Sequence, residues 1–301
     1  MRIVSFGDLY CDYYFKNDIL QGVMGGKSNA NILANLSKYY DTCYIGITTN
    51  DSAGILAKST LEELNIDVSH INIIDGNCKK FFISEDGYTQ VCPYCNRDLS
   101  YKGIKTKSEY VIPYLKEDDI LIIDSLNDLS LEVLEAVDNM AFLDIGYVGN
   151  LRFLSLDEII DIIGNRFKII NINEKVYDYF KNKFSIDSVD LYNYLKPDIL
   201  IITRGKKGVD IIYNGEFEKK EIENPAVEVD SNGAGDAFFS EFIHIYLEDK
   251  AVDARMISKA YIKASTLSRR VVSKLGARTH LIPLKRIKQY KECICSEFEY
   301  L

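Results

Sequence analysis

Short apolar runs recur along the chain, and stretches in which apolar residues repeat at helical spacing lie between many of them. The unbroken runs DILIID (119–124) and DILIIT (198–203) are typical of strands that are buried on both faces, as in a parallel sheet. The runs predict strands over residues 3–6, 43–48, 71–74, 80–84, 120–124, 141–144, 168–172, 199–203 and 209–213. The helical spacing predicts helices over residues 31–40, 53–64, 131–137, 156–163, 175–183, 236–247 and 253–272. This alternation favours a layered α/β fold with a mainly parallel sheet.

One stretch interrupts the alternation. Residues 71 to about 107 are strand-like and rich in turn residues, and no good helical pattern appears between Asp75 and Ser108. No linker rich in Pro, Gly or Ser divides the chain. We therefore predict one domain over residues 1–301 that carries a small β appendage.

Composition narrows the class of protein. A length of 301 residues with 47% apolar residues fits one large globular domain. The net charge of −9 argues against a general nucleic-acid binder but leaves room for a locally positive pocket. The first residues show no export leader, and no apolar run reaches the ~18–20 residues that cross a bilayer. We expect a cytoplasmic protein with no membrane or nucleic-acid partner, whose seven cysteines are reduced.

The stretch VDSNGAGDAFFSEFIHIYL (229–247) carries the first chemical signal. Three small residues, Gly233, Ala234 and Gly235, run into Asp236, and an amphipathic helical pattern follows. A helix N-terminus exposes unpaired backbone N–H groups, and small residues let an anion such as phosphate approach them. Asp236 either caps this helix or accepts the proton of a hydroxyl that meets a phosphoryl group there. Both readings fit the local sequence.

Polar motifs also follow predicted strands or precede predicted helices elsewhere. GGKSNANILANL (25–36) places a Gly pair, a Lys and two Asn residues ahead of a helix. NINE (171–174) and TRGKKG (203–208) each end a predicted strand with polar groups. Ligands of open α/β sheets bind outside the carboxyl ends of the strands, so these motifs predict one shared site.

Taken together, the motifs resemble those of the PfkB-type carbohydrate kinases, within the ribokinase-like superfamily. The family signature D-T-x-G-A-G-D corresponds to DSNGAGD (230–236), with Ser231 in place of Thr. The N-x-x-E motif corresponds to Asn171 and Glu174, and T-x-G-x-x-G corresponds to Thr203, Gly205 and Gly208. Further matches are Gly7 with Asp12, the pair Gly25 and Gly26, and the tail LGA (275–277) followed by Pro283. They run in the family's order over nearly the whole chain.

The resemblance implies a three-layer α/β/α fold and an ATP- and Mg²⁺-dependent kinase. Its β lid would be built from about residues 10–30 and 71–107, and family lids often form homodimer contacts. Asp236 would be the general base, and Gly233, Ala234 and Gly235 would line the anion hole. The implied nucleotide and Mg²⁺ residues are Asn171, Glu174, Thr203, Gly205, Gly208 and Ser231. The implied substrate residues are Asp12, Gly26, Lys27 and Asn31.

The substrate class follows less directly. The resemblance implies transfer of the γ-phosphoryl group to a hydroxyl, expected to be a primary alcohol, of a small sugar or sugar derivative. Lys79, Lys80, Arg97 and Lys102 are scattered along the lid, which favours an unphosphorylated substrate. A nucleoside kinase is the alternative on the same fold, because Tyr10, Tyr13 and Tyr14 flank Asp12 and could stack on a base.

The string CPYC (92–95) has a separate set of readings. A redox motif needs a strand before it and a helix start after it, and NRDLSYKGIK is a poor helix start. Cys92 and Cys95 are also half of a tetrahedral zinc site. Cys78, Cys293 and Cys295 are further candidate ligands, or a symmetric dimer pools two pairs. Ordinary reduced lid cysteines are the simplest reading, and a zinc-bearing protein without catalytic turnover is the third functional alternative.

Overall fold

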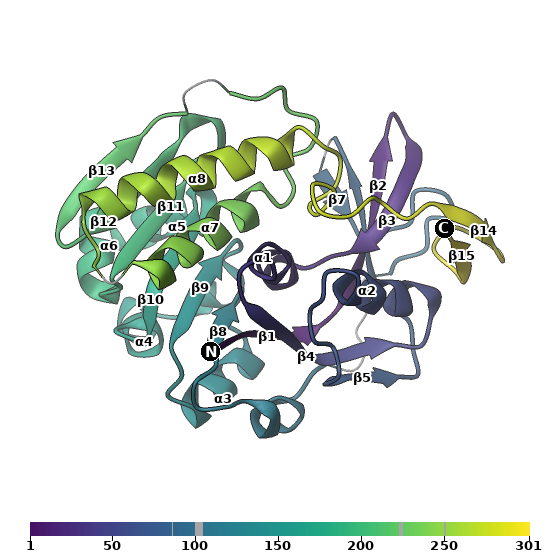
Figure 1. Cartoon of the computed structure of the whole chain (residues 1–301), viewed down its shortest axis with the longest axis horizontal. Coiled ribbons are helices and arrows are strands. Elements are labelled where there is room, and N and C mark those ends of the chain that lie inside the picture. Colours follow the sequence, from purple (N-terminus) through teal and green to yellow (C-terminus); the bar gives the residue numbers. More distant parts are fainter. Residues whose placement is uncertain (86, 100–104, 223–224, 250) are drawn as a thin grey trace.

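The computed structural model places a nine-stranded sheet at the centre of the molecule, in the order β13-β12-β11-β10-β9-β8-β1-β4-β5 (Figure 1). Residues 1–301 are described except for 86, 100–104, 223–224 and 250. All neighbouring pairs from β5 through β11 are parallel, and β12 and β13 add antiparallel edge strands. The strands of this sheet are β1 (Arg2–Asp8), β4 (Asp41–Thr49), β5 (Ile71–Ile74), β8 (Ile120–Ile123), β9 (Ala141–Ile145), β10 (Phe167–Asn173), β11 (Ile199–Thr203), β12 (Val209–Tyr213) and β13 (Glu216–Lys220).

Helices cover both faces of this sheet, because its central strands bury side chains on both sides. One face packs against α1 (Ser28–Leu36), α2 (Ser52–Glu62), α7 (Ala234–Glu248) and α8 (Ala254–Val272). The other face packs against α3 (Asp128–Ala136), α4 (Leu156–Ile163), α5 (Glu174–Phe184) and α6 (Ser188–Leu195). The predicted α/β/α layering is confirmed.

A separate four-stranded sheet stands beside the large one (Figure 1). Its order is β3-β2-β6-β7, formed by β2 (Tyr10–Lys16), β3 (Ile19–Gly25), β6 (Lys79–Ser84) and β7 (Gly87–Thr89). We call it the lid sheet. Residues on β2 alternate between its two faces, so that Cys11 and Tyr13 join one apolar cluster while Tyr10 and Asp12 turn to the opposite side.

The last residues form a third, smaller element that we call the C-terminal strap (residues 285–301). It contains β14 (Ile287–Tyr290) and β15 (Phe298–Tyr300), and it lies beside the lid sheet, drawn in yellow in Figure 1. Ile294 and Phe298 pack into the apolar cluster behind the lid sheet. The strap is bound to α2 by a hydrogen bond of 3.0 Å from the Phe298 amide to Ser52 Oγ.

Several elements differ from the sequence-based expectations. Strand β5 pairs with β4 at the edge of the large sheet, so the second lid segment begins after residue 74 rather than at 71. Helix α1 begins at Ser28, three residues before the predicted start, which places Asn31 within the helix rather than at its first position. Helix α6 and the edge strand β13 were not predicted, because each is short and rich in polar residues.

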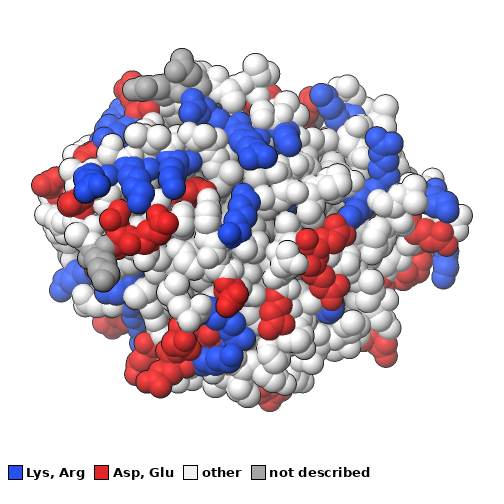
Figure 2. All heavy atoms as spheres, viewed as in Figure 1, with Lys and Arg blue, Asp and Glu red and all other residues white. Residues whose placement is uncertain are grey.

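The surface gives two broad observations. On the face that carries α8, basic and acidic side chains lie in small interspersed groups (Figure 2). Among the described residues, no helix is both long enough and apolar enough to span a bilayer.

Candidate functional site

A cavity of about 1120 Å³ opens between the carboxyl ends of the central strands and the lid sheet. This volume is larger than that of most small-ligand pockets, so it has room for two ligands side by side. Eight of the predicted site residues line it: Asp12, Lys27, Asn31, Asn171, Thr203, Gly233, Gly235 and Asp236. The predicted residues that do not line it are Gly26, Glu174, Gly205, Gly208, Ser231 and Ala234.

Asp236 lies in the first turn of α7, where no side chain caps the helix. The N-cap is Gly233, whose φ of 77° lies in the left-handed region. A Cβ at this position would lie 2.6 Å from the Cβ of Ala277, so only glycine fits. Gly233 and Gly235 line the cavity beside Asp236, whereas the Ala234 amide donates to the Ser231 carbonyl at 3.3 Å.

Two side chains of α1 hold the carboxylate of Asp236. Ser28 Oγ lies 2.5 Å from Asp236 Oδ1, and Asn31 Nδ2 donates to Oδ2 at 2.7 Å. Burial raises the pKa of Asp236, while the hydrogen bonds from Ser28 and Asn31 lower it. Of the two asparagines that follow the Gly pair, Asn31 reaches this site, whereas Asn29 donates to the Phe6 carbonyl.

A second carboxyl group, Asp144 at the end of β9, shares Ser28 with Asp236. Ser28 Oγ lies 2.9 Å from Asp144 Oδ2, and Asn171 Nδ2 donates to Asp144 Oδ1 at 2.6 Å. Burial and the negative charge of Asp236 raise the pKa of Asp144 to about 7. Because a hydroxyl has one proton, Ser28 can donate to only one of the two carboxyl groups. The contact with the other carboxyl group is favourable when that group is protonated, which the raised pKa of Asp144 promotes.

A buried arginine fixes the orientation of Asn31. Arg278 is fully buried, and its Nε donates to Asn31 Oδ1 at 2.7 Å while Nη2 donates to the Gly26 carbonyl at 2.8 Å. Since Arg278 is a donor only, the oxygen of the Asn31 amide must face it and the nitrogen must face Asp236. Sequence reasoning missed Arg278, although it directly follows the LGA string of the predicted tail.

Asp12 forms the lid side of the cavity. Tyr14 donates to Asp12 Oδ2 at 3.3 Å, and burial raises the pKa of Asp12 to about 7. A Cβ at Gly26 would lie 2.3 Å from Asp12 Oδ1, so the absence of a side chain at Gly26 lets the backbone pass against this carboxyl group. The Gly26 backbone therefore packs against the Asp12 carboxyl group.

The residues of the two motifs at the ends of β10 and β11 do not all face the cavity. Asn171 Oδ1 is a buried acceptor without a protein partner, and Thr203 lines the cavity. Glu174 instead accepts from Lys207 Nζ at 2.9 Å and lies 3.6 Å from Arg204. The predicted nucleotide residues therefore split into a group that faces the cavity and a basic turn that is occupied by ion pairs.

Four lysines line the cavity, namely Lys79, Lys105 and Lys107 from the predicted lid segment and Lys27 from the start of α1. Along the sequence, the basic lid residues looked scattered. Asp8, Glu109 and Asp124 also line the cavity and offset most of this positive charge. Of the other basic lid residues, Lys80 pairs with Asp51 and Arg97 pairs with Glu292, whereas Lys102 lies outside the described residues.

Aromatic rings cover the same part of the cavity. Tyr10, Phe81 and Tyr88 line it, with ring centroids 5.5 Å apart for Tyr10 and Phe81 and 5.6 Å apart for Phe81 and Tyr88. Tyr13 and Tyr14 are fully buried, so of the three tyrosines named from the sequence only Tyr10 is available to a ligand.

Sequence reasoning also passed over Asp124, which follows β8, and Ser28. Asp124 ends the DILIID run, so a polar residue at the end of a buried strand was a signal that could have found it. Ser28 carried no such signal, because its role depends on two aspartates that are remote in sequence. Cys92 and Cys95 do not line this cavity.

Comparisons with known proteins bear on this site. A model of the pfkB family carbohydrate kinases matches residues 16–283. No curated relative matches the sequence. Among solved structures, a sugar kinase from Pyrococcus horikoshii has a TM-score of 0.71 at 19% identity, covering 92% of this chain and 93% of that one.

Two further structures were solved with ligands. Aminoimidazole riboside kinase from Salmonella enterica, complexed with aminoimidazole riboside and an ATP analog, has a TM-score of 0.70 at 17% identity and covers 94% of this chain and 97% of that one. Fructokinase from Vibrio cholerae O395, bound to fructose, ADP and calcium, has a TM-score of 0.73 at 16% identity and covers 93% and 95%. At these identities the structures show a shared fold. The family match covers most of the chain, and the protein therefore belongs to the pfkB family of carbohydrate kinases, which are phosphotransferases with an alcohol group as acceptor.

Proposed function

We propose that this kinase transfers the γ-phosphoryl group of ATP to a hydroxyl, preferably a primary alcohol, of a small unphosphorylated sugar or sugar derivative. The observation that carries the proposal is the carboxylate of Asp236, which faces the cavity at the uncapped N-terminus of α7 and is held by Ser28 and Asn31. The family match favours this function over a binding protein without turnover.

In this proposal, Asp236 accepts the proton of the substrate hydroxyl as its oxygen attacks the γ-phosphorus. Asn31 and Ser28 hold the carboxylate in place, and Arg278 positions Asn31. The N–H groups of Gly233 and Gly235, which line the cavity, stabilise the negative charge on the transferring group. Ala234, the third predicted member of the anion hole, donates its N–H to the Ser231 carbonyl instead.

The substrate would lie under the lid sheet. Asp12 accepts hydrogen bonds from its hydroxyl groups, with Gly26 behind it, and Asn31 and Lys27 border it from the α1 side. Four lysines (Lys27, Lys79, Lys105 and Lys107) share this region with three carboxylates (Asp8, Glu109 and Asp124), which leaves little excess positive charge. This balance favours an unphosphorylated substrate.

The nucleotide would lie along the other half of the cavity, by the turns after β10 and β11. Thr203 lines the cavity there. Gly205, Gly208 and Ser231, which do not line it, would border the nucleotide only where the nucleotide extends beyond the cavity. The residues present also fit Mg²⁺, because Asn171 offers an unpartnered buried oxygen and Asp144 lies beside it. When bound, Mg²⁺ would offset charge on the phosphate groups. Asn171 and Asp144 would hold its water ligands, whereas Glu174 would first have to leave its ion pairs with Lys207 and Arg204.

A nucleoside kinase is the second candidate, and one observation favours it. Tyr10, Phe81 and Tyr88 form a continuous aromatic surface on the cavity face of the lid sheet. Such a surface can stack on a heterocyclic base as well as on the apolar face of a sugar ring.

The predicted homodimer through the lid stays a prediction. The strap covers the lid face that turns away from the cavity, so a lid contact would use the free edge at β7.

We expect a substrate screen to separate these candidates. ADP release from ATP and Mg²⁺ would be measured with free sugars, amino sugars, sugar acids, glycated amino acids, sugar phosphates and nucleosides. The proposal expects turnover with an unphosphorylated sugar or sugar derivative. Turnover with nucleosides alone would favour the second candidate, and turnover with sugar phosphates alone would contradict the charge argument.

The raised pKa values of Asp236 and Asp144 predict how catalysis depends on pH. Because burial raises the pKa of Asp236 and raises that of Asp144 to about 7, the ionised base is populated above this range and is lost as the pH falls. We expect kcat/KM to fall between about pH 8 and pH 5, with an apparent pKa well above that of a free carboxyl group.

The variant Asp144→Asn isolates this effect from the titration of ATP itself. It keeps the shape of the side chain but removes the negative charge that the pair shares. The fall of kcat/KM on the acid side should therefore occur at lower pH than in the wild-type enzyme under the same buffers. If kcat/KM fell over the same pH range in both enzymes, the pair of Asp144 and Asp236 would not set the pH profile.

A further inference from the structure

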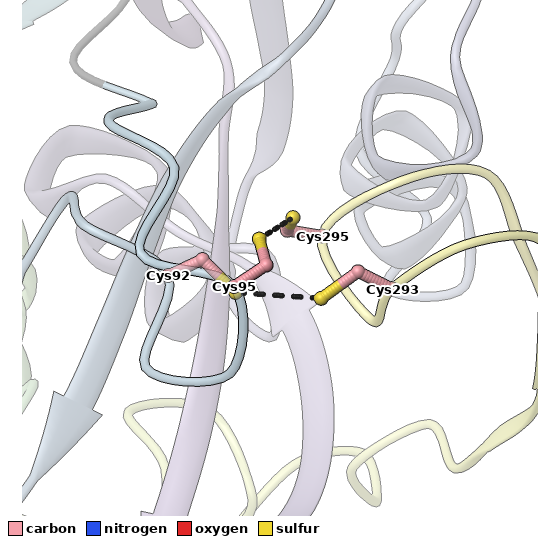
Figure 3. Close-up of side chains that lie close together, drawn as sticks. All are labelled: Cys92, Cys95, Cys293 and Cys295. Atoms are coloured by element: carbon pink, nitrogen blue, oxygen red, sulfur yellow. Dashed lines mark hydrogen bonds between the residues drawn. The ribbon is translucent and has the colours of Figure 1, made fainter.

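Four cysteine sulfurs converge behind the lid sheet, outside the lining of the cavity. Cys92 and Cys95 come from the turn after β7, and Cys293 and Cys295 come from the turn between β14 and β15 in the strap (Figure 3). The four sulfurs all lie within 4.8 Å of one another. Figure 3 shows the four side chains directed toward a common centre, with Cys92 and Cys293 sulfurs 3.6 Å apart and Cys95 and Cys295 sulfurs 3.5 Å apart.

We propose that these four thiolates bind one Zn²⁺ ion, which fastens the C-terminal strap to the lid sheet. Four sulfurs that share a tetrahedral zinc ion at about 2.3 Å lie about 3.8 Å from one another. The observed separations bracket this value. Two disulfides would need only two close pairs, whereas one ion requires all four sulfurs to converge, as they do here.

Backbone hydrogen bonds close both turns. In the first turn, the Cys92 amide donates to the Arg97 carbonyl at 2.9 Å, and the Asn96 amide donates to the Cys92 carbonyl at 2.9 Å with φ of 56° at Asn96. In the second turn, the Ser296 amide donates to the Cys293 carbonyl at 2.9 Å. The ligands are therefore presented in pairs by closed backbone turns rather than by free side chains.

The four cysteines differ in their exposure to solvent. Cys92 and Cys295 are buried while Cys95 is exposed, so the ion has an entry path on one side.

The strap needs such a fastening. Its two strands have four and three residues, and a hairpin of this size is marginally stable by itself. Among the residues of the strap, only Ile294, Cys295 and Phe298 are buried. A bound ion adds stability where apolar burial is small. The family match ends at residue 283, so Cys293 and Cys295 lie outside it.

The chain itself decides between the ligand sets that the sequence left open. Cys293 and Cys295 complete the set, and Cys78 stays out of it, with its sulfur directed at the Leu9 carbonyl. One chain supplies all four sulfurs, so no partner subunit is required. A mononuclear site also agrees with the compact spacing, because a cluster of several irons would separate the sulfurs further.

The test is the metal content of the full chain, purified without chelators and measured by mass spectrometry of the elements. We expect about one zinc per chain, and X-ray absorption should show four sulfur neighbours at about 2.3 Å. Cys95→Ser and Cys293→Ser, one from each turn, should lose the zinc. The control Cys43→Ala, in β4 of the large sheet, should keep it.

A second measurement keeps the test decisive if a variant fails to fold. Wild-type chain that is stripped with a mercurial and reloaded with Co²⁺ should show sulfur-to-metal charge-transfer bands. Stripping should also make the strap sensitive to protease while the rest of the chain stays resistant. Iron in place of zinc, or only three of the seven cysteines titrating because two disulfides have formed, would overturn the proposal.

Discussion

Asp236→Asn should lose turnover by on the order of 10²-fold or more while it keeps the fold and the affinity for nucleotide. The amide has nearly the same shape as the carboxylate, so Asn31 and Ser28 can still pack against it. It cannot accept the proton of the attacking hydroxyl. The loss should therefore appear in kcat, measured as ADP release at saturating substrate, and not in the dissociation constant for ATP.

A matched control lies at the other end of the same helix. Asp249 is the C-cap of α7 and pairs with Lys259 at 3.4 Å on the surface. Asp249→Asn should leave kcat close to that of the wild-type enzyme. Near-normal turnover of Asp236→Asn would remove Asp236 from the role of base, and equal losses in both variants would point to the stability of α7 instead.

Asp51→Ala should lower the free energy of unfolding by about 3–5 kcal/mol, because it leaves a buried ammonium group without its counter-charge. Lys80 on β6 is 1% exposed, and its Nζ lies 2.8 Å from Asp51 Oδ2. Asp51 also caps α2 by accepting from the Gly54 amide at 3.0 Å, and it accepts from the Cys78 amide at 3.0 Å. One carboxylate thus joins the lid sheet to the helix beneath it.

Urea denaturation of single and double variants would measure this contribution. The variant Asp51→Ala with Lys80→Met should be more stable than Asp51→Ala alone, because the unpaired charge is then removed. Glu62→Ala, which breaks the exposed pair of Lys58 and Glu62 on the same helix, should cost no more than about 0.5 kcal/mol. A double variant as unstable as the single one would show that lost capping, rather than the buried charge, sets the cost.

Much of the fold follows from local patterns. The predicted bounds of α4, β11 and β12 match the structure, because capping residues or buried apolar runs define these elements locally. The bounds of strand β5 were also predicted, but the sheet to which it belongs could not be assigned from local pattern. Its run of four residues fits either sheet, and only the pairing with β4 decides which one it joins.

Some features of the site likewise follow from local sequence, and others depend on tertiary structure. The sequence by itself determined the loop of small residues before Asp236 and the polar ends of the buried strands, because helix starts and strand ends are set by neighbouring residues. Tertiary structure alone decided that Ser28 bridges Asp144 and Asp236 and that Arg278 orients Asn31. It also brought Cys92 and Cys95 to Cys293 and Cys295, some 200 residues away along the chain. Such contacts depend on how layers and sheets pack, and no local spacing encodes them.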